Sequence, residues 1–500
     1  MNFQFVYQSL RNFIPETILI GTFLVALCTD MIFKQKKITA ITALLGIVAA
    51  GYFTILQTKL PPALAFTGTY VFHPPFGMYM VDSFAVFFKL LLALAGVVIV
   101  LFSMNSRELA EESKTHIGEY YALLVAMMVG MFLMTSVSDI LMMYIALELV
   151  SISSYILAGF LKNVYRSGEA ALKYVIFGAA ASGLMLYGFS LLFGLTGTTN
   201  IFEIYDFLAS HSVNHVTLLL SGILILAGFG YKISAVPFHF WTPDVYEGAP
   251  ITITAFLSVA SKAAGFAMLL RFLLIAYPQS LSNKEGFYWI AVLTGICVLT
   301  MSIGNLVALQ QTNMKRLLAY SSIAQAGYIL MGVVMHSVLG LTAVIIYFAM
   351  YLFMNLGAFY VVQVIAEKIG SEEIEDYKGL AKRMPFLSGM MVVFMMSLTG
   401  IPLTAGFIGK FYLFAAVLQN RDMYWLAVIA GLNSVIALYY YIKVIKAMYL
   451  DKGEEGERIP IGVTPVLLTL LMGIPTILFG VWFTPIVNFA QKTVMAFVSQ

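Results

Sequence analysis

Residues 215–250 read HVTLLLSGILILAGFGYKISAVPFHFWTPDVYEGAP, and this stretch decides what kind of fold the chain adopts. It begins as an apolar run long enough to cross a bilayer, but Lys232 lies deep within that run and Pro237 follows it. Because proline cannot donate a backbone hydrogen bond, Pro237 leaves the carbonyl of Ile233 without its helical partner. Bare backbone at membrane depth is tolerated only against protein or water. The stretch therefore predicts a broken membrane helix with a hydrated site beside Lys232.

The rest of the chain has the composition of a membrane protein with many crossings. Of its 500 residues, 61% are hydrophobic and 11% are charged, and the mean hydropathy is +0.91. Soluble chains are about 45–50% apolar and about 25% charged, so a soluble enzyme, a secreted disulfide protein and a disordered chain are excluded. The net charge of +3 indicates no nucleic-acid partner. Two isolated cysteines and six scattered histidines favour neither an iron–sulfur, nor a zinc, nor a haem site.

Apolar runs separated by polar, glycine or proline breaks predict an all-α fold with about 14 transmembrane helices. The expected spans are 14–33, 38–57, 82–104, 117–135, 138–160, 170–193, 215–236, 251–276, 287–309, 316–335, 339–366, 386–418, 424–450 and 463–487. The first lacks the pattern of a cleaved signal peptide and is expected to stay as an anchor. The run 386–418 is too long for one straight crossing and contains GIPLTAGFIGK at 400–410. We expect it to be broken, with Pro402 freeing the carbonyl of Leu398.

Two broken helices, each with a buried lysine, indicate an internal duplication. Lys232 and Lys410 are 178 residues apart. We expect two five-helix repeats, formed by helices 4–8 and helices 9–13, and an odd number of helices inverts one repeat relative to the other, as in transporters. The predicted segments are an N-terminal three-helix segment at 1–116, a first repeat at 117–276, a second repeat at 287–450 and a C-terminal helix at 451–500.

Charges at helix ends indicate the orientation of the chain. Most of the 28 lysines and arginines share one side of the membrane if the N-terminus is placed outside. The positive-inside rule then places both termini on the external side. In this scheme Arg271 belongs to an external helix end. Lys89, about seven residues into its helix, is expected to reach water by extending its long side chain towards the interface.

Three lysines and one glutamate lie too deep for that escape. Lys232, Lys262 and Lys410 are each ten or more residues from at least one end of their runs, where a charge costs about 2.5–3.5 kcal/mol. Glu148 lies in the middle of LMMYIALELVSISSYIL at 141–157. We interpret it as part of a proton or ion path, with a purely structural ion pair as the alternative. His239, just past Pro237, is either a proton relay or a hydrogen-bonded packing residue.

These residue types suit proton transfer. Burial lowers the pKa of a lysine and a nearby carboxylate raises it again, so moving the carboxylate changes the proton affinity of the amine. A row of such lysines joined by water could relay protons, with Glu148 as the switchable counter-charge of Lys232. The chemistry alone does not identify the ion.

Several long motifs resemble the antiporter-like membrane subunits of respiratory complex I (NADH:quinone oxidoreductase), and the subunit N branch most closely. They are IALELVSISSYILAGF, ALKYVIFGAAASGLMLYG, GYKISAVPFHFWTPDVYEGAP, TAFLSVASKAAGF, MKRLLAYSSIAQAGYILMG and GIPLTAGFIGKFYLF. The resemblance implies that Glu148 matches an essential glutamate of helix 5 and Lys232 a lysine of helix 7. It also implies that Lys262 is a bridging lysine of helix 8 and Lys410 a terminal lysine of helix 12. Gln325, in SSIAQAGY, departs from the histidine that relatives often have there.

The resemblance also implies a function and a setting. The chain would translocate protons in a bacterial cytoplasmic membrane, coupled to electron transfer elsewhere, without a redox centre of its own. NADH, FMN, the iron–sulfur clusters and quinone would be bound by other subunits, and the neighbours would be M-type, K-type and A/J/H-type membrane subunits. The main alternative is a subunit of a multi-subunit cation/proton antiporter. A stand-alone secondary transporter and a non-conducting scaffold are further alternatives.

Overall fold

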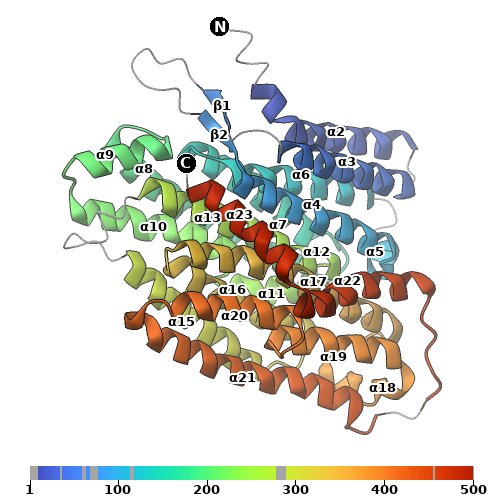
Figure 1. Ribbon diagram of the computed structural model, residues 1–500. Helices are drawn as coiled ribbons and strands as arrows, with labels where there is room; N and C mark the ends of the chain where they lie inside the picture. Colours follow the sequence, from blue (N-terminus) through green and yellow to red (C-terminus); the bar gives the residue numbers. More distant parts are fainter. Residues whose placement is uncertain are drawn as a thin grey trace.

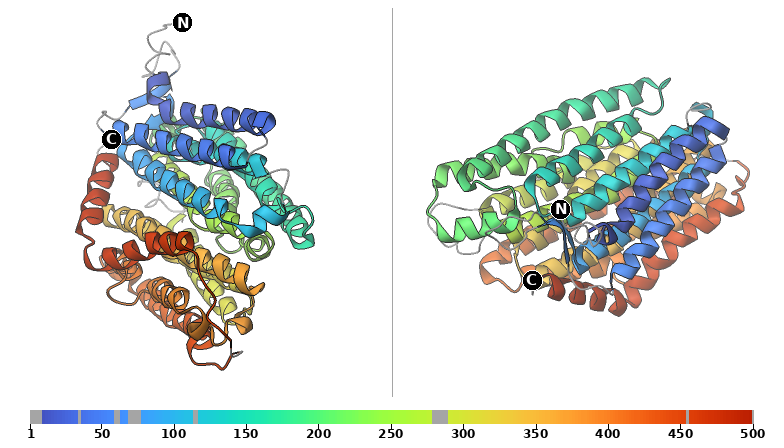
Figure 2. Two further views of the ribbon diagram at one scale, coloured as in Figure 1. Left: turned by 90° about the vertical axis from the view of Figure 1, so that its right-hand side faces the viewer. Right: turned by 90° about the horizontal axis from the view of Figure 1, so that it is seen from above.

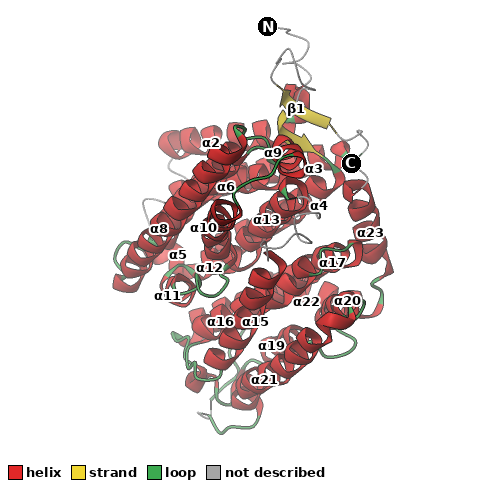
Figure 3. Ribbon diagram, turned by 90° about the vertical axis from the view of Figure 1, so that its left-hand side faces the viewer, coloured by secondary structure: helices red, strands yellow, loops and turns green. Residues whose placement is uncertain are grey.

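The computed structural model describes residues 9–33, 36–58, 63–67, 77–112, 117–277, 289–453 and 456–498. Thirteen helices within these residues are long and apolar enough to cross a membrane. A further crossing is made of two shorter apolar helices, α19 (Pro385–Thr399) and α20 (Ala405–Val417). The predicted all-α membrane fold is confirmed, and Figures 1 and 3 show how nearly all of the described chain is helical.

The N-terminal segment contains three long helices and a small β-hairpin. The helices are α2 (Ile14–Phe33), α3 (Lys36–Gln57) and α4 (Ser83–Met104), followed by the short α5 (Arg107–Glu112). Strands β1 (Ala63–Thr67) and β2 (Gly77–Val81) pair antiparallel, with Ala63 opposite Val81. This hairpin is not visible in the sequence, because its strands are only five residues long and lie between two much stronger apolar runs.

The first five-helix unit is built from α6 to α13, coloured cyan to green in Figure 1. Its elements are α6 (Ile117–Ser136), α7 (Ile140–Ala158), α8 (Tyr165–Thr196), the short α9 (Ile201–Ser210), α10 (His215–Ile233), α11 (Trp241–Gly248), α12 (Ile251–Phe256), the π-helix η1 (Leu257–Ser261) and α13 (Lys262–Ala276). The predicted break after Lys232 is confirmed, because α10 ends at Ile233 and α11 begins only at Trp241.

The second unit, yellow to orange in Figure 1, repeats this plan. Its elements are α15 (Trp289–Ala308), α16 (Met314–Val334), α17 (Val338–Ile369), η2 (Ile374–Tyr377), α18 (Leu380–Arg383), α19, α20, η3 (Arg421–Met423) and α21 (Tyr424–Tyr449). The broken crossing is again the fourth of the five, as the sequence predicted. The predicted boundaries after residue 116 and before residue 287 adjoin residues 113–116 and 278–288, which lie outside the described chain.

A capping aspartate, Asp139, separates α6 from α7, the first two crossings of the first unit. Asp139 accepts hydrogen bonds from the backbone N–H groups of Leu141, at 2.9 Å, and Met142, at 3.2 Å. Such a cap satisfies donors that the first turn of a helix leaves free. Two helices, α6 and α7, therefore replace the single long helix that this region could have formed.

The C-terminal region has one more helix than expected. The predicted span 463–487 is divided into α22 (Val463–Val481) and α23 (Thr484–Val498). Proline is over-represented in the first turn of a helix, so Pro485 favours a new start there. Helix α23 packs against both α17 and α4, and Figure 2 shows the chain returning along it from the second unit to the N-terminal segment.

Candidate functional site

The three deep lysines predicted from the sequence are all buried. Lys232 lies in the last turn of α10, Lys262 begins α13 and Lys410 lies in α20, and their exposed fractions are 1%, 3% and 5%. Each comes beside an interruption of regular helix. The structure therefore buries all three lysines inside the protein, each beside such an interruption.

Glu148 and Lys232 act on each other without forming a closed ion pair. Both residues are described, yet no carboxylate oxygen of Glu148 lies within 4.0 Å of the ammonium group of Lys232. The Lys232 Nζ atom and the Glu148 Oε1 atom are each buried without a hydrogen-bond partner, and Glu148 is the charge that acts on Lys232. Buried polar groups are ordinarily hydrogen-bonded to protein or water. The arrangement fits a pair that can close or be bridged by water.

The side chain of Lys232 packs against α13, the helix that carries Lys262. A Cβ atom placed on Gly265 would lie 3.1 Å from Lys232 Cγ. Gly265 follows Lys262 by three residues, so the two lysines share one region of α13. Glycine at 265 is what leaves room for the Lys232 stem.

Lys262 is held by a neighbouring helix rather than by an acid. Its ammonium group donates to the backbone carbonyl of Ser322, at 2.9 Å, and to the Ser322 hydroxyl, at 2.8 Å. The residues just before it form the π-helix η1, a feature that is rare and frequently found at functional sites. Nothing in the sequence had indicated this π-helix.

Lys410 folds back onto the break in its own crossing. It donates to the carbonyl of Thr399 at 2.8 Å, and its Nζ atom lies 4.4 Å from the centre of the Tyr328 ring. Gly400 has φ +93°, and a Cβ atom there would lie 2.9 Å from Lys410 Cδ. Position 400 thus requires glycine both for its backbone conformation and for the lysine stem.

Gln325 takes up the carbonyl that Pro402 was predicted to free. Its Nε2 atom donates to the carbonyl of Leu398 at 3.0 Å, while its Oε1 atom accepts from the Tyr347 hydroxyl. Gln325 lies on α16 between Ser322, which binds Lys262, and Tyr328, which faces Lys410. Residues at this spacing share one face of a helix. One face of α16 therefore joins Lys262 to Lys410.

His239 lies in the turn between α10 and α11. It is 5% exposed, its Nδ1 atom has no hydrogen-bond partner, and its ring lies 4.5 Å from that of Phe240. The charge of Lys262 acts on it. His239 is therefore close enough to Lys262 to interact with it electrostatically, and its Nδ1 atom is buried without a partner.

The expectation that Lys89 extends to water is wrong. Its ammonium group lies 2.8 Å from a carboxylate oxygen of Glu16 and donates to the Tyr79 hydroxyl at 2.5 Å, and both charged side chains have an exposed fraction of 0%. The first turn of α2 places Glu16 against α4, so the lysine finds its partner inside the protein. The only sequence signal was a carboxylate near the start of an apolar run, where an interfacial role is the usual one.

Arg271 is likewise not an exposed helix-end cation. Its guanidinium group is fully buried and bidentate to Asp82, at 2.8 and 2.9 Å, and it also donates to the carbonyl of Thr135. The rings of Phe84 and Phe497 lie 5.4 and 5.5 Å from it. Helix α23, which the sequence did not predict, supplies Phe497 and covers this end of the bundle.

Within the described residues, no group of three or more His, Cys, Asp or Glu side chains is placed to hold a metal ion. The chemistry that the site offers is proton binding by amines, hydroxyls, a carboxylate and an imidazole.

Comparison with known proteins gives consistent matches over almost the whole chain. The family model described as NADH:quinone oxidoreductase/Mrp antiporter, TM matches residues 137–437. A protein of Chloroherpeton thalassium named NADH-quinone oxidoreductase subunit N 2 is 49% identical, over 96% of this chain and 94% of its own length. A chain of the respiratory complex I of Thermus thermophilus is 29% identical with a TM-score of 0.77, covering 95% of this chain and 99% of that one. A chain of the Mrp complex from Dietzia sp. shares the fold, with a TM-score of 0.82 at 20% identity and 97% coverage of each chain.

Proposed function

Because the chain belongs to the NADH:quinone oxidoreductase/Mrp antiporter membrane family, we propose that it serves as an N-type proton-translocating subunit of an NADH:quinone oxidoreductase. Its close relatives carry that subunit name over nearly the full length of the chain. The chain is a multi-pass membrane protein, and the similar chain of known structure belongs to a multi-subunit complex.

The observation that carries the proposal is the row of buried cations without acidic partners. Among the described residues, no carboxylate lies within 4.0 Å of the ammonium groups of Lys232, Lys262 or Lys410. Burying such charges is costly, and charged groups retained at membrane depth ordinarily mark ion or proton paths. Amines in this setting can exchange protons with water and with one another.

In the proposed sequence of events, electron transfer in other subunits changes the separation of Glu148 and Lys232. The proton released or bound there passes through Lys262, across the α16 face that bears Ser322 and Gln325, to Lys410. Lys410 exchanges it with one side of the membrane, and His239 is an additional relay beside Lys262. Each step moves one proton between neighbouring bases, so charge and atoms are conserved.

The setting follows from the same proposal. NADH, FMN, the iron–sulfur clusters and quinone would be bound by other subunits, and M-type, K-type and A/J/H-type membrane subunits would be the neighbours. The complex would lie in a bacterial cytoplasmic membrane with both termini of this chain outside. The segments 1–116, 117–276, 287–450 and 451–500 would be its building blocks.

A second function is favoured by one observation. The fold is shared with a chain of an Mrp complex, so a subunit of a cation/proton antiporter is the alternative. Sodium-dependent proton movement in vesicles without any electron donor would support that alternative.

The experiment that tests the main proposal replaces Glu148 with Gln, and Lys232, Lys262 and Lys410 each with Met, in the assembled complex. NADH-driven quinone reduction and proton pumping are measured in vesicles. We expect each variant to lose coupled turnover. Wild-type turnover and a wild-type proton/electron ratio in all four variants would overturn the proposal.

A further inference from the structure

A polar pocket of about 640 Å³ opens where α5, α12, α16 and α17 meet. Its lining includes Glu108, Lys315, Gln363, Glu367 and Glu372. The pocket lies at the end of the molecule that the positive-inside rule assigns to the cytoplasm. None of these residues belongs to the row of lysines described above.

Glu108 is the carboxylate that ties this pocket to the Lys262 crossing. One of its oxygens accepts the backbone N–H of Ile251, the first residue of α12, at 3.2 Å. Lys262 follows eleven residues later, which corresponds to about 16 Å along a helix. Burial raises the pKa of the Glu108 carboxyl, and the charge of Lys315 opposes that shift.

The other charges around Glu108 come from neighbouring elements. Glu367 on α17 and Glu372 after it both act on Glu108, and Lys315 on α16 pairs with Glu372 at 3.1 Å. Arg107 and Glu111 of α5, with Arg166, Glu247 and Glu373, complete the charged lining. Glu108 thus lies in a pocket that is lined by both acidic and basic side chains.

A stripe of polar side chains runs from this pocket along α17. Glu367, Gln363, Asn355, Tyr351 and Tyr347 follow one another at intervals of four residues or a multiple of four, and only Phe359 interrupts them. Residues four apart are neighbours on a helix surface. Gln363 donates to Glu367 at 3.2 Å at one end, and Tyr347 donates to Gln325 at the other.

The stripe passes the elements that hold Lys262. Asn355 donates to the hydroxyl of Ser258 at 2.6 Å, and Ser258 belongs to the π-helix η1 that immediately precedes Lys262. The Tyr246 ring of α11 lies 6.4 Å from that of Phe359, so its side chain is close to the one interruption of the stripe. The polar stripe therefore leads from the pocket to the π-helix beside Lys262, the middle lysine of the proposed relay.

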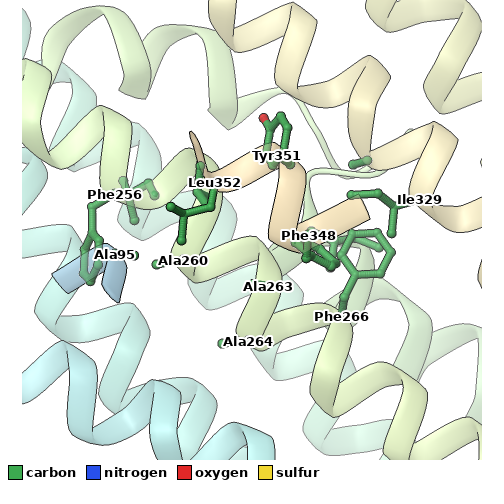
Figure 4. Close-up of a cluster of buried hydrophobic side chains, with 14 of the residues drawn as sticks. Ala95, Phe256, Ala260, Ala263, Ala264, Phe266, Ile329, Phe348, Tyr351 and Leu352 are labelled. Atoms are coloured by element: carbon green, nitrogen blue, oxygen red, sulfur yellow. The ribbon is translucent and has the colours of Figure 1, made fainter. Parts of the chain in front are cut away.

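Several polar atoms along this path are buried and have no partner. They are Gln363 Oε1, Asn355 Oδ1 and the hydroxyls of Tyr351 and Tyr246, from side chains no more than 3% exposed. In Figure 4 the Tyr351 hydroxyl points away from the apolar cluster around Phe348 and Phe266. Leaving a buried polar group without a hydrogen-bond partner is energetically costly. Such groups are normally satisfied by ordered water, which needs polar partners of this kind.

We propose that the pocket is a proton-uptake port, that Glu108 is its loading group, and that a file of water along Gln363, Asn355 and Tyr351 carries protons to Lys262. The inference rests on the proposed function. A hydronium ion gives its proton to the Glu108 carboxylate, the resulting carboxylic acid passes a proton into the water file, and the neutral amine of Lys262 takes one up. Glu108 is then a carboxylate again.

The test compares Glu108→Gln with Glu111→Gln in the intact complex in vesicles. Both residues line the pocket and belong to α5, but Glu111 is exposed, and it is Glu108 that accepts the Ile251 N–H of α12. Loss of a positioned proton donor slows transfer by about 10²–10⁴ fold when that step is limiting. We expect at least about a tenfold loss of pumping for Glu108→Gln at alkaline pH, where protons are scarce, a smaller loss at acidic pH, and partial rescue by Glu108→Asp.

A second pair of variants tests the water file. Tyr351→Phe removes an unpartnered hydroxyl on the path, whereas Tyr377→Phe removes one that belongs to η2 and not to the stripe on α17. We expect slower pumping only in Tyr351→Phe. If Lys262→Met abolishes pumping while Glu108→Gln and Tyr351→Phe match their controls, the port is overturned and the proposed function stands. A Glu108→Gln defect that is independent of pH and not rescued by Asp also overturns it. Wild-type pumping by Lys262→Met counts against the proposed function itself.

Discussion

Two groups of buried cations in this molecule have opposite surroundings. In and beside the N-terminal segment, Lys89 and Arg271 each lie against a carboxylate, with Glu16 and Asp82 at 2.8 Å. In the two repeats, the described surroundings of Lys232, Lys262 and Lys410 place no carboxylate within 4.0 Å of any ammonium group. All five side chains are buried. Depth alone therefore does not separate the two groups, whereas an acidic partner does. We propose that the cations without one are the functional ones.

The difference predicts different consequences of mutation. Removing one partner of a buried ion pair leaves an uncompensated charge and costs about 3–5 kcal/mol. Removing Lys262 or Lys410, on which no acidic side chain acts, leaves no such charge behind. Variants of the first group should lose stability and keep function, while variants of the second should lose function and keep stability.

The largest effect is expected for Lys262→Met. Lys262 lies between Lys232 and Lys410, so losing its amine should interrupt the relay and lower coupled quinone reduction by more than about tenfold. The thermal unfolding temperature of the complex should not fall, because methionine fills a similar volume without a buried charge. Quinone reductase assays and thermal unfolding of one preparation check both points. A variant that is inactive and also strongly destabilised would contradict the predicted difference between the two groups.

Asp82→Asn should show the opposite behaviour. Arg271 would keep its charge without a charged partner, so we expect the free energy of unfolding to fall by about 3–5 kcal/mol. Unfolding temperature and yield of assembled complex measure the loss, with the exposed Asp422→Asn as control. The complexes that do assemble should pump normally. A lowered proton/electron ratio in them would place Arg271 among the functional cations.

The Glu16 and Lys89 pair offers a test of compensation. Glu16→Leu and Lys89→Met should each destabilise the protein, whereas the double variant should approach the wild-type stability because no charge is left unpaired. A double-mutant cycle on unfolding temperatures measures the coupling. Additive losses in the double variant would show that the pair does not act as a unit.

The smallest effect is expected for Gly265→Ala. The new Cβ atom would lie 3.1 Å from both Lys232 Cγ and Ile233 Cγ2, so the Lys232 stem must shift by a few tenths of an ångström. Overpacking of this kind costs about 1–3 kcal/mol, and we expect pumping to fall a few-fold. Gly295→Ala, with no atom within 4 Å of its new Cβ, is the matched control. Equal pumping by the two variants would mean that the position of Lys232 is not critical.

Much of the fold could be predicted because its signals are local. Long apolar runs define the crossings, and Pro237 and Pro402 mark the two breaks by removing backbone donors. The deep lysines are visible for the same reason, since the distance of a charge from the end of an apolar run can be read from the sequence. The sequence predicted that the carbonyl of Leu398 would lose its helical partner. It did not predict that this carbonyl accepts a hydrogen bond from the Gln325 side-chain amide.

The features that were missed depend on contacts between distant segments. Glu16 and Asp82 lie near helix starts, where a carboxylate usually faces the interface, and only the packing of α2 and α13 brings Lys89 and Arg271 to them. The hairpin and α23 are short and lie outside the strongest apolar runs. The π-helix before Lys262 has no sequence signature in LSVAS at 257–261.

The most direct test of the central claim is the number of protons pumped per electron in vesicles for two variants, Lys262→Met and the double variant Glu16→Leu/Lys89→Met. Both remove a buried lysine, but only the first removes one without an acidic partner. We predict a lowered ratio or no coupled turnover for Lys262→Met and the wild-type ratio for the double variant. A wild-type ratio at normal turnover in Lys262→Met, or a lowered ratio in the double variant, would contradict the account.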